Sequence, residues 1–393
     1  MVRPTFARID VAALKTNYRA LRAFVTPPSA GRRPPQVIAV LKANAYGHGA
    51  VTVARALEDA GASMLACADI EEGVQLRRSG VRIPILVFGA LSISDLAGVF
   101  EHRLTPTVSS PSAARALHEI AARRGVRLRC HLKVDTGMNR FGFRYDNLRA
   151  TLPDVLASRH LVFEAVYTHF ATADASDASL FEQQQQRFDA STALLSELGL
   201  AALPRHAANS AALLRDRRTW LDAVRPGLLL YGAVPDGLPA PTALRLRPVL
   251  SLHSRIVAVK GMRPGETCGY GARFRADRPT RVAVIPAGYA DGLDVRMAGV
   301  GAVLVRGRRA PIVGSVCMDS ITIDVTEMDV SPGDRVVLIG AQGGECIGVG
   351  EVADWIGTVP HEILCRTGSR IERVYSDTET DSAAAESGEP AAP

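Results

Sequence analysis

The sequence lacks the features that would assign it to a membrane or to the secretory pathway. No apolar run approaches the roughly 18 residues that a helix needs to cross a bilayer. The opening residues, MVRPTFARID, contain neither an apolar core nor a cleavage-like site, so no signal peptide is expected. We therefore expect a cytoplasmic protein that has no membrane partner.

Paired cysteines and clustered basic residues are also missing. No C-x-x-C pair occurs, and the cysteines are widely separated, at Cys67, Cys130, Cys268, Cys317, Cys346 and Cys365. This spacing favours reduced thiols and argues against a disulfide framework or a zinc site, so no metal is expected. The net charge is only +6, and the arginines are not clustered with aromatic residues. A nucleic-acid partner is therefore not expected.

The chain does contain alternating short apolar segments and amphipathic helices over its first 240 residues. Apolar residues recur at helical spacing over 11–25 and predict an opening helix, with Asp10 as its N-cap. Strand candidates follow at 37–41, 63–67, 83–88, 104–108, 127–134, 161–168, 204–207 and 222–225. Alternating strands and helices indicate a parallel sheet, and eight such units in about 230 residues favour a (β/α)₈ barrel of the TIM type.

The pattern changes after residue 240. A proline-rich linker, PDGLPAPTALRLRP, leads into short β-type segments separated by glycine and proline turns, with one clear short helix, EVADWIG. The predicted fold is therefore α/β, with an N-terminal barrel over 11–240 and a C-terminal mainly-β domain over 241–376. Residues 1–10 could join the second domain. The tail over 377–393 has almost no apolar bulk and is predicted to be disordered.

The segment VIAVLKANAYGHG, residues 37–49, raises a question about Lys42. A lysine that ends an apolar strand can be an ordinary solvated loop residue. Alternatively, Lys42 projects from the C-terminal end of a barrel strand, where active sites of this fold lie. There it could form a Schiff base with a carbonyl cofactor.

Other polar residues also follow barrel strands and bear on this choice. They are Lys133 and Arg140 after the fifth strand, His169 after the sixth, Asn209 and Ser210 after the seventh, and Arg225 and Gly227 after the eighth. Each has a purely structural alternative. Asn209 or Ser210 could serve solely as a helix cap, and 225–227 could be simply a turn that ends a strand. His169 could be an ordinary core residue, and Lys133 could form an ion pair with Asp135.

Taken together, these residues suggest a carbonyl cofactor that carries a phosphate and is bound to Lys42. Pyridoxal 5'-phosphate (PLP) fits this description. Its phosphate would lie near Ser210, the backbone N–H groups of Gly227 and Leu228, and Tyr46, because barrel loops 7 and 8 often bind phosphate. Arg225 is the candidate partner of the ring nitrogen.

The sequence resembles the alanine racemase family, whose PLP-lysine signature is similar to VLKANAYGHG. The resemblance covers roughly residues 5–375 and continues in family order through KVDTGM, THFATAD, ANSAA, VRPGLLLYG, GYGARF, IPAGYADG and VGSVCMDS. It implies a homodimer with shared active sites, in which the PLP-bearing Lys42 is one catalytic base and Tyr270 of the partner subunit is the other. The implied activity interconverts L-alanine and D-alanine and supplies D-alanine for peptidoglycan.

The resemblance also implies roles for residues around these two bases. Arg140 would contact the substrate carboxylate, His169 would hydrogen-bond Tyr270, and Lys133 would be the lysine that many members carry as a carbamate. Met318 and Asp319 would reach the partner's site, and Tyr289 would line the substrate entrance.

Two departures from the family pattern stand out. Asn139-Arg140-Phe141 replaces the usual Gly-Arg-Leu, and His361 stands where a tyrosine hydroxyl usually touches the cofactor phosphate.

The residues also suit racemisation chemically. Two bases on opposite faces can remove and return a proton without crossing the substrate plane, and both pKa values must be lowered from about 10 for this role. A guanidinium such as Arg225 can only donate, so the ring nitrogen should stay unprotonated and transamination should be suppressed. The alternatives left open are a serine or broader-specificity racemase, a barrel-type PLP decarboxylase, and a PLP-binding protein without turnover.

Overall fold

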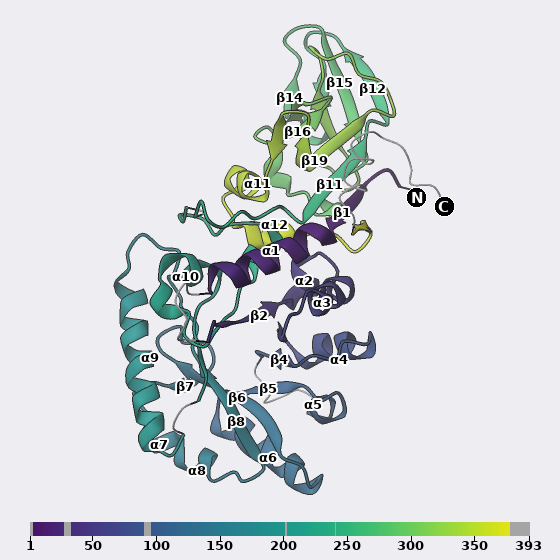
Figure 1. Ribbon diagram of the computed structural model, residues 1–393. Coiled ribbons are helices and arrows are strands. Elements are labelled where there is room, and N and C mark those ends of the chain that lie inside the picture. Colours follow the sequence, from purple (N-terminus) through teal and green to yellow (C-terminus); the bar gives the residue numbers. More distant parts are fainter. Residues whose placement is uncertain (1–2, 27–32, 90–95, 201–202, 240, 378–393) are drawn as a thin grey trace.

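The computed structural model describes residues 3–26, 33–89, 96–200, 203–239 and 241–377. An α/β barrel and a mainly-β domain lie end to end along the molecule (Figure 1). Among the described residues, none of the helices combines the length and the hydropathy that crossing a bilayer requires. All six cysteines are described, and all six are free thiols.

Eight parallel strands form the barrel, which closes where β10 pairs with β2. In ring order they are β2 (Gln36–Val40), β3 (Met64–Cys67), β4 (Ile85–Val87), β5 (Thr105–Val108), β6 (Leu128–Asp135), β8 (Leu161–Tyr167), β9 (Arg205–His206) and β10 (Ala223–Val224). A short strand, β7 (Phe143–Arg144), is added beside β6. Each predicted strand overlaps one of the eight, and the predicted barrel is confirmed.

Helices surround the barrel and connect its strands (Figure 1). They are α1 (Val11–Phe24), α2 (Lys42–Tyr46), α3 (Ala50–Asp59), α4 (Ile70–Arg78), α5 (Ala97–Glu101), α6 (Pro111–Arg123), α7 (Leu148–Thr151), α8 (Pro153–Leu156), α9 (Ser179–Glu197) and α10 (Ser210–Arg215), with 3-10 turns η1 (Arg217–Thr219) and η2 (Leu228–Tyr231). The opening helix is confirmed: Asp10 accepts a hydrogen bond from the Ala13 amide at 2.7 Å. Leu14, Tyr18 and Leu21 are buried on one face of α1, so hydrophobic burial holds this helix in place.

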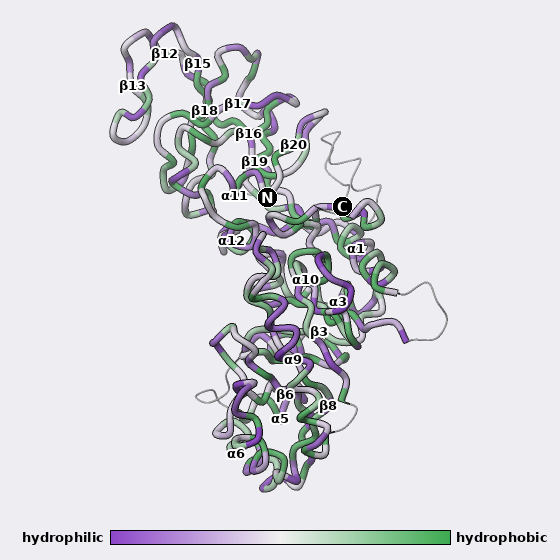
Figure 2. Tube along the Cα trace, turned by 90° about the vertical axis from the view of Figure 1, so that its left-hand side faces the viewer, coloured by the Kyte–Doolittle hydropathy of each residue, from purple (hydrophilic) through white to green (hydrophobic). Residues whose placement is uncertain are grey.

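The second domain is built on a ten-stranded sheet. Its strands are β1 (Phe6–Asp10), β11 (Leu250–Arg255), β12 (Ala258–Met262), β15 (Thr280–Ile285), β16 (Ala302–Val305), β17 (Arg308–Val313), β18 (Ile321–Asp324), β19 (Arg335–Gln342), β20 (Glu345–Ile347) and β21 (Glu372–Ser376). The remaining elements are β13 (Thr267–Cys268), β14 (Phe274–Arg275), η3 (Tyr270–Ala272), η4 (Tyr289–Asp291), η5 (Val295–Met297), α11 (Val349–Ile356) and α12 (Pro360–Cys365). The view turned by 90° shows β13 at the end of the molecule remote from the barrel (Figure 2).

The N-terminal strand belongs to the second domain, although the chain continues from it into the barrel. β1 pairs antiparallel with β11 and parallel with β21, so residues 6–10 lie within the sheet of the C-terminal domain. The chain then enters the barrel through α1. The predicted domain limit at 240/241 stays a prediction, because residue 240 lies outside the described residues. The predicted tail also lies outside them, except for Asp377, which forms an ion pair with Lys15 at 2.7 Å.

The second domain contains a helix that the sequence analysis did not predict beside α11. This helix, α12, begins with Pro360 at its first turn, and it packs against α2 of the barrel. A Cβ atom on Gly47, directly after α2, would lie 2.2 Å from the backbone oxygen of Leu364. The close approach requires glycine at position 47 and brings α12 to the C-terminal end of the barrel.

Candidate active site

A cavity of about 290 Å³ opens at the C-terminal ends of the barrel strands. Most of the predicted site residues line it: Lys42, Tyr46, Lys133, Arg140, His169, Asn209, Ser210, Arg225, Gly227, Leu228 and His361. Its volume is at the lower end of the range for small-molecule sites, roughly 300–1,000 Å³. The barrel therefore brings together side chains that are far apart in the sequence.

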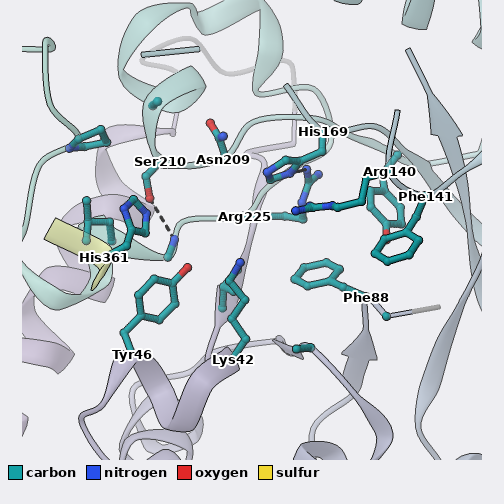
Figure 3. Close-up of a pocket in the computed structure, with 18 of the residues that line it drawn as sticks. Lys42, Tyr46, Phe88, Arg140, Phe141, His169, Asn209, Ser210, Arg225 and His361 are labelled. Atoms are coloured by element: carbon teal, nitrogen blue, oxygen red, sulfur yellow. Dashed lines mark hydrogen bonds between the residues drawn. The ribbon is translucent and has the colours of Figure 1, made fainter. Parts of the chain in front are cut away.

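Lys42 begins the short element α2, whose backbone is a strained turn rather than a right-handed helix. The four residues that follow it, 43–46, are all non-glycine and all have φ between 52° and 55°, a left-handed conformation. This conformation costs roughly 1–2 kcal/mol per residue, so surrounding contacts must enforce it. Glu72 accepts a 2.7 Å hydrogen bond from the Ala43 amide, and the Asn44 side chain accepts one of 2.8 Å from Ala50. As a result, Lys42 and Tyr46 both project into the cavity (Figure 3).

The electrostatic surroundings of Lys42 favour a reactive amine. Partial desolvation in the cavity, followed by the positive charge of Arg140, lowers the pKa of Lys42 from its ordinary value. A lysine with a lowered pKa is neutral more of the time and can therefore act as a nucleophile or a base. By surface area Lys42 is exposed, yet its side chain lines the cavity rather than the outer face of a loop.

One end of the cavity carries hydroxyl and amide groups. The Ser210 hydroxyl accepts hydrogen bonds from the backbone amides of Gly227 at 3.0 Å and Leu229 at 3.4 Å. The Tyr46 hydroxyl lies so close that a Cβ atom on Gly227 would be 2.2 Å from it. Any larger residue at position 227 would therefore force the Tyr46 ring to move. Asn209 caps α10 by accepting from Ala212 at 2.9 Å, so the helix-cap alternative is correct for Asn209, although this residue also lines the cavity.

Arg225 is buried, with 3% of its surface exposed, and its guanidinium is held from several sides. One amino group donates to His206 Nδ1 at 2.9 Å. The other donates to the backbone oxygens of Thr168 at 2.7 Å and Ala207 at 2.9 Å, and lies 3.3 Å from His169 Nδ1. Burial lowers the pKa of Arg225 to about 10, so the group remains a cation at neutral pH.

Lys133 lies buried in the cavity wall. Burial, and then the positive charges of Arg140 and Arg225, lower its pKa to about 8. Its proposed ion pair with Asp135 is wrong: in the described part of the chain no such pair forms. Asp135 instead accepts from the amides of residues 137–139 at 3.0 to 3.1 Å, and it thereby shapes the loop that presents Arg140.

His361 reaches the cavity from α12 of the second domain. Its ring lies 5.9 Å from the ring of Tyr46, measured between centroids, on the side of the cavity near Ser210 (Figure 3). Burial and then the nearby Lys42 lower the pKa of His361, while Asp174 opposes this shift. His361 is therefore mostly neutral at pH 7.

Four predicted residues, Tyr270, Tyr289, Met318 and Asp319, do not line this cavity. They lie in the second domain, and Tyr270 is 78% exposed. Hydrogen bonds connect their segments: the Ser315 hydroxyl donates to the backbone oxygen of Tyr270 at 2.7 Å, and the Tyr289 amide donates to the backbone oxygen of Cys317 at 2.9 Å.

Phe88, Tyr167 and Asp174 are among the cavity-lining residues that were not predicted from the sequence. Phe88 directly follows β4 and Tyr167 ends β8, so position at a strand end was the available signal. Asp174 lies in the loop after β8 and ends the segment THFATAD, which was quoted for the family resemblance without a role for this residue.

Comparison with known proteins identifies the family. The model of the alanine racemase N-terminal domain matches residues 9–235, and that of the C-terminal domain matches residues 249–375. The chain belongs to the alanine racemase family. It is 41% identical over 377 residues to the alanine racemase of Desulforamulus reducens, covering 95% of this chain and 100% of the relative.

Solved alanine racemase structures superpose on most of the molecule. One from a D-cycloserine-producing Streptomyces lavendulae gives a TM-score of 0.89 at 31% identity, covering 97% of this chain and 99% of the other. One from Bartonella henselae, with covalently bound pyridoxal phosphate, gives 0.82 at 31% identity, covering 95% and 99%. Alanine racemases depend on this cofactor.

The residues of the cavity fit pyridoxal phosphate. The Lys42 amine projects into the space (Figure 3). One end carries the Ser210 hydroxyl and the Gly227 amide that donates to it, and the Tyr46 hydroxyl can approach closely there because residue 227 has no side chain. Arg225, which can donate but not accept, also lines the cavity, beside His169 (Figure 3). The groups at the Ser210 end suit a phosphate, the Lys42 amine suits a carbonyl carbon, and the Arg225 guanidinium suits a ring nitrogen.

Proposed function

We propose that this protein interconverts L-alanine and D-alanine with two bases, Lys42 and Tyr270 of the partner subunit. The observation that carries the proposal is the presence of Lys42 and the buried Arg225 in one cavity. A PLP enzyme that needs a strong electron sink pairs the ring nitrogen with a carboxylate. Arg225 offers only N–H donors, which favours short-lived carbanions and rapid reprotonation over transamination or decarboxylation.

The residues of the chain would bind and orient the reactants. Pyridoxal phosphate, when bound, supplies an electron-withdrawing ring that acidifies the Cα–H bond of an attached amino acid. Ser210, the Gly227 amide and Tyr46 would hold the phosphate, and Arg225 would donate to the ring nitrogen. Arg140 would bind the substrate carboxylate. The Lys42 amine would then take or return the Cα proton on one face.

The second base is assigned to a partner subunit. Tyr270 is 78% exposed and absent from the cavity of its own chain, and the nearby Tyr289 and Met318 are also exposed at 45% and 53%. Large apolar side chains that gather on one surface favour a protein interface. A homodimer in which this surface covers the partner's barrel would bring Tyr270, Met318 and Asp319 to the opposite face of the substrate, with Tyr289 at the substrate entrance and His169 as hydrogen-bond partner of Tyr270.

Lys133 is proposed as a carbamate. Its pKa of about 8 makes the neutral amine accessible near neutral pH. The amine nitrogen would form a bond to the carbon of CO₂ and release one proton. The resulting negative charge would lie among Lys42, Arg140 and Arg225, where it would hold Arg140 in position.

His361 supports a second candidate, a racemase with a broader substrate range that includes serine. An imidazole is shorter than the phenol usually found there, and it leaves more space beside Tyr46. A PLP-binding protein without turnover is a weaker candidate, since the chain retains both Lys42 and Tyr270 and the second domain that carries Tyr270. The proposed role is cytoplasmic supply of D-alanine for peptidoglycan.

The test is direct. The purified holoenzyme should show the visible absorbance band of lysine-bound pyridoxal phosphate. It should also abolish the optical rotation of L-alanine and, more slowly, that of L-serine. A protein with the absorbance band that leaves both rotations unchanged would exclude the racemase proposal and favour the binding protein.

A further inference from the structure

A second, larger cavity of about 720 Å³ lies at the opposite end of the barrel, where the strands begin. Its lining includes Gln36, Met64, Arg205 and Ala223, which are the first residues of β2, β3, β9 and β10. It also includes two histidines from the barrel interior, His131 of β6 and His206 of β9.

These histidines connect the second cavity to Arg225. His131 Nδ1 lies 3.0 Å from His206 Nε2, and His206 Nδ1 lies 2.9 Å from Arg225 Nη1. His131, His206 and Arg225 are only 4%, 1% and 3% exposed. The His206 ring stacks on Tyr167, with centroids 4.7 Å apart and an interplanar angle of 11°, so its plane is fixed.

The chemistry of the guanidinium determines where each proton lies. Arg225 can only donate, so His206 Nδ1 must accept and carry no proton. The proton of the neutral His206 ring is then on Nε2, from which it donates to His131 Nδ1. His131 in turn carries its own proton on Nε2, the nitrogen not used in this contact. Burial lowers the pKa of His131 to about 4 and that of His206 well below its ordinary value, so both rings are neutral at pH 7.

We propose that His131 is a positioning residue for the reaction: by accepting from His206 it holds His206 in the tautomer that accepts from Arg225. The other tautomer would place an N–H group of His206 against an N–H group of Arg225. The guanidinium would then lose an acceptor and shift relative to the ring nitrogen that it serves. His131 also lines the cavity at the far end of the barrel. The kinetic part of this inference rests on the proposed function.

Two variants of His131 separate its hydrogen bond from its bulk. His131→Leu fills the space but cannot accept, and it should lower kcat roughly ten- to a hundredfold, the effect of losing one hydrogen bond to a charged group. The KM for alanine should change less than about twofold, and the fraction of turnovers ending in half-transamination should rise. His131→Asn places an oxygen where Nδ1 was, and should restore kcat to within about threefold of the wild type.

A matched control removes another imidazole, one that is partly buried. His253→Leu, in the sheet of the second domain, loses a histidine that is bonded to Ser251 and whose pKa is similarly lowered to about 4. It should leave kcat and the product ratio unchanged. If His131→Leu matches this control, or if His131→Asn is as impaired as His131→Leu, the proposal is overturned.

The tautomers can be observed directly in the wild-type holoenzyme, whatever its substrate. Neutron diffraction from a deuterated crystal should show deuterium on Nε2 of both His206 and His131, and none on Nδ1 of either ring. Deuterium on His206 Nδ1 would overturn the inference even if alanine is racemised. If the expected deuterium pattern is found in a protein that does not racemise alanine, the proposed function is wrong but the assignment of the tautomers stands. If His131→Leu fails to fold, His131→Val, which is smaller and also cannot accept, replaces it, with the same expected loss of kcat.

Discussion

The guanidinium of Arg225 donates a 2.7 Å hydrogen bond to the backbone oxygen of Thr168, although the two residues belong to different strand ends of the barrel. The contact is buried and ties the loop after β8 to the end of β10. Arg225 therefore does two things: it faces the cavity, and it satisfies carbonyl groups that would otherwise be buried without a donor.

Replacing Arg225 with glutamate should change the outcome of the reaction. A carboxylate accepts from a protonated ring nitrogen, which strengthens the electron sink and prolongs the carbanion. We expect racemisation to fall at least tenfold and half-transamination to rise, measured as pyruvate formed per alanine racemised. Arg225→Lys keeps the positive charge and should lose rate without gaining transamination. If both variants form the same amount of pyruvate per alanine racemised, Arg225 is not the partner of the ring nitrogen.

Lys42→Ala should abolish covalent attachment of the cofactor. Borohydride treatment followed by peptide mapping should find no labelled residue, and activity should fall by about a thousandfold or more, as expected for loss of a catalytic base. Lys133, the other lysine that lines the cavity, provides the control. Lys133→Ala should still be labelled at Lys42. Stoichiometric label at one site in Lys42→Ala would show that the assignment is wrong.

His361 should make cofactor affinity depend on pH. Burial and Lys42 lower the pKa of His361 below 6.5, so the imidazole is neutral at pH 7 and becomes a cation only in more acidic solution. A cation attracts phosphate, and affinity should therefore rise as the pH falls through this pKa. His361→Tyr should lack this component, bind the cofactor more tightly at pH 7 and prefer alanine over serine more strongly. Cofactor titrations of the wild type and His361→Tyr from pH 5 to pH 8 measure the difference in affinity. If the two plots of affinity against pH superimpose and the ratio of alanine to serine activity is equal, His361 does not contact the cofactor.

Mixed dimers test whether the two bases come from different chains. Lys42→Ala and Tyr270→Phe homodimers should each be nearly inactive. Random reassociation after joint unfolding makes half of the dimers mixed, and each mixed dimer regains one of two sites, so about a quarter of the wild-type activity should return. Mixing Lys42→Ala with the double variant Lys42→Ala/Tyr270→Phe restores no site and is the control. Inactive mixtures in which mixed dimers are demonstrated would place both bases in one chain.

Asp291 should contribute to stability in a pH-dependent way. Its side chain is fully buried and forms ion pairs with Arg3 at 2.9 Å and Arg370 at 2.8 Å. Burial alone would raise the pKa of this carboxyl, but hydrogen bonds from Arg370 and Arg3 lower it overall. In the unfolded chain the pKa of this carboxyl is near 3.9, and in the folded protein it is lower. The ionised carboxylate therefore stabilises the fold fully above about pH 3.9, and this stabilisation is lost as the pH falls through the pKa of the folded state.

Urea unfolding at constant protein concentration measures this contribution. Asp291→Asn should lower the free energy of unfolding by about 1–3 kcal/mol at pH 7, and the difference from wild type should shrink below about pH 4. Asp146→Asn, which breaks an exposed ion pair with Arg144, should change little. A constant difference across the whole pH range would contradict the role of the carboxylate charge.

Local sequence patterns were sufficient for the barrel and for much of the cavity. Alternating apolar strands and amphipathic helices predict parallel strands, and a polar residue directly after such a strand must lie at the C-terminal rim. Lys42, His169 and Arg225 were found in this way. The helix α12 was missed because PHEILC is only six residues long and begins with proline, so its pattern does not distinguish a helix from a loop.

The sequence by itself determined which side chains end the strands, because strand periodicity and strand termini are local properties. Closure of the barrel decided what those side chains contact. The left-handed turn at 43–46 exists because Glu72 and neighbouring groups hold it, and no short-range preference of alanine or tyrosine predicts it. The contacts from His131 through His206 to Arg225 join strands that are 75 and 19 residues apart in the chain. Such contacts depend on how the whole ring of strands packs, which only the tertiary structure decides.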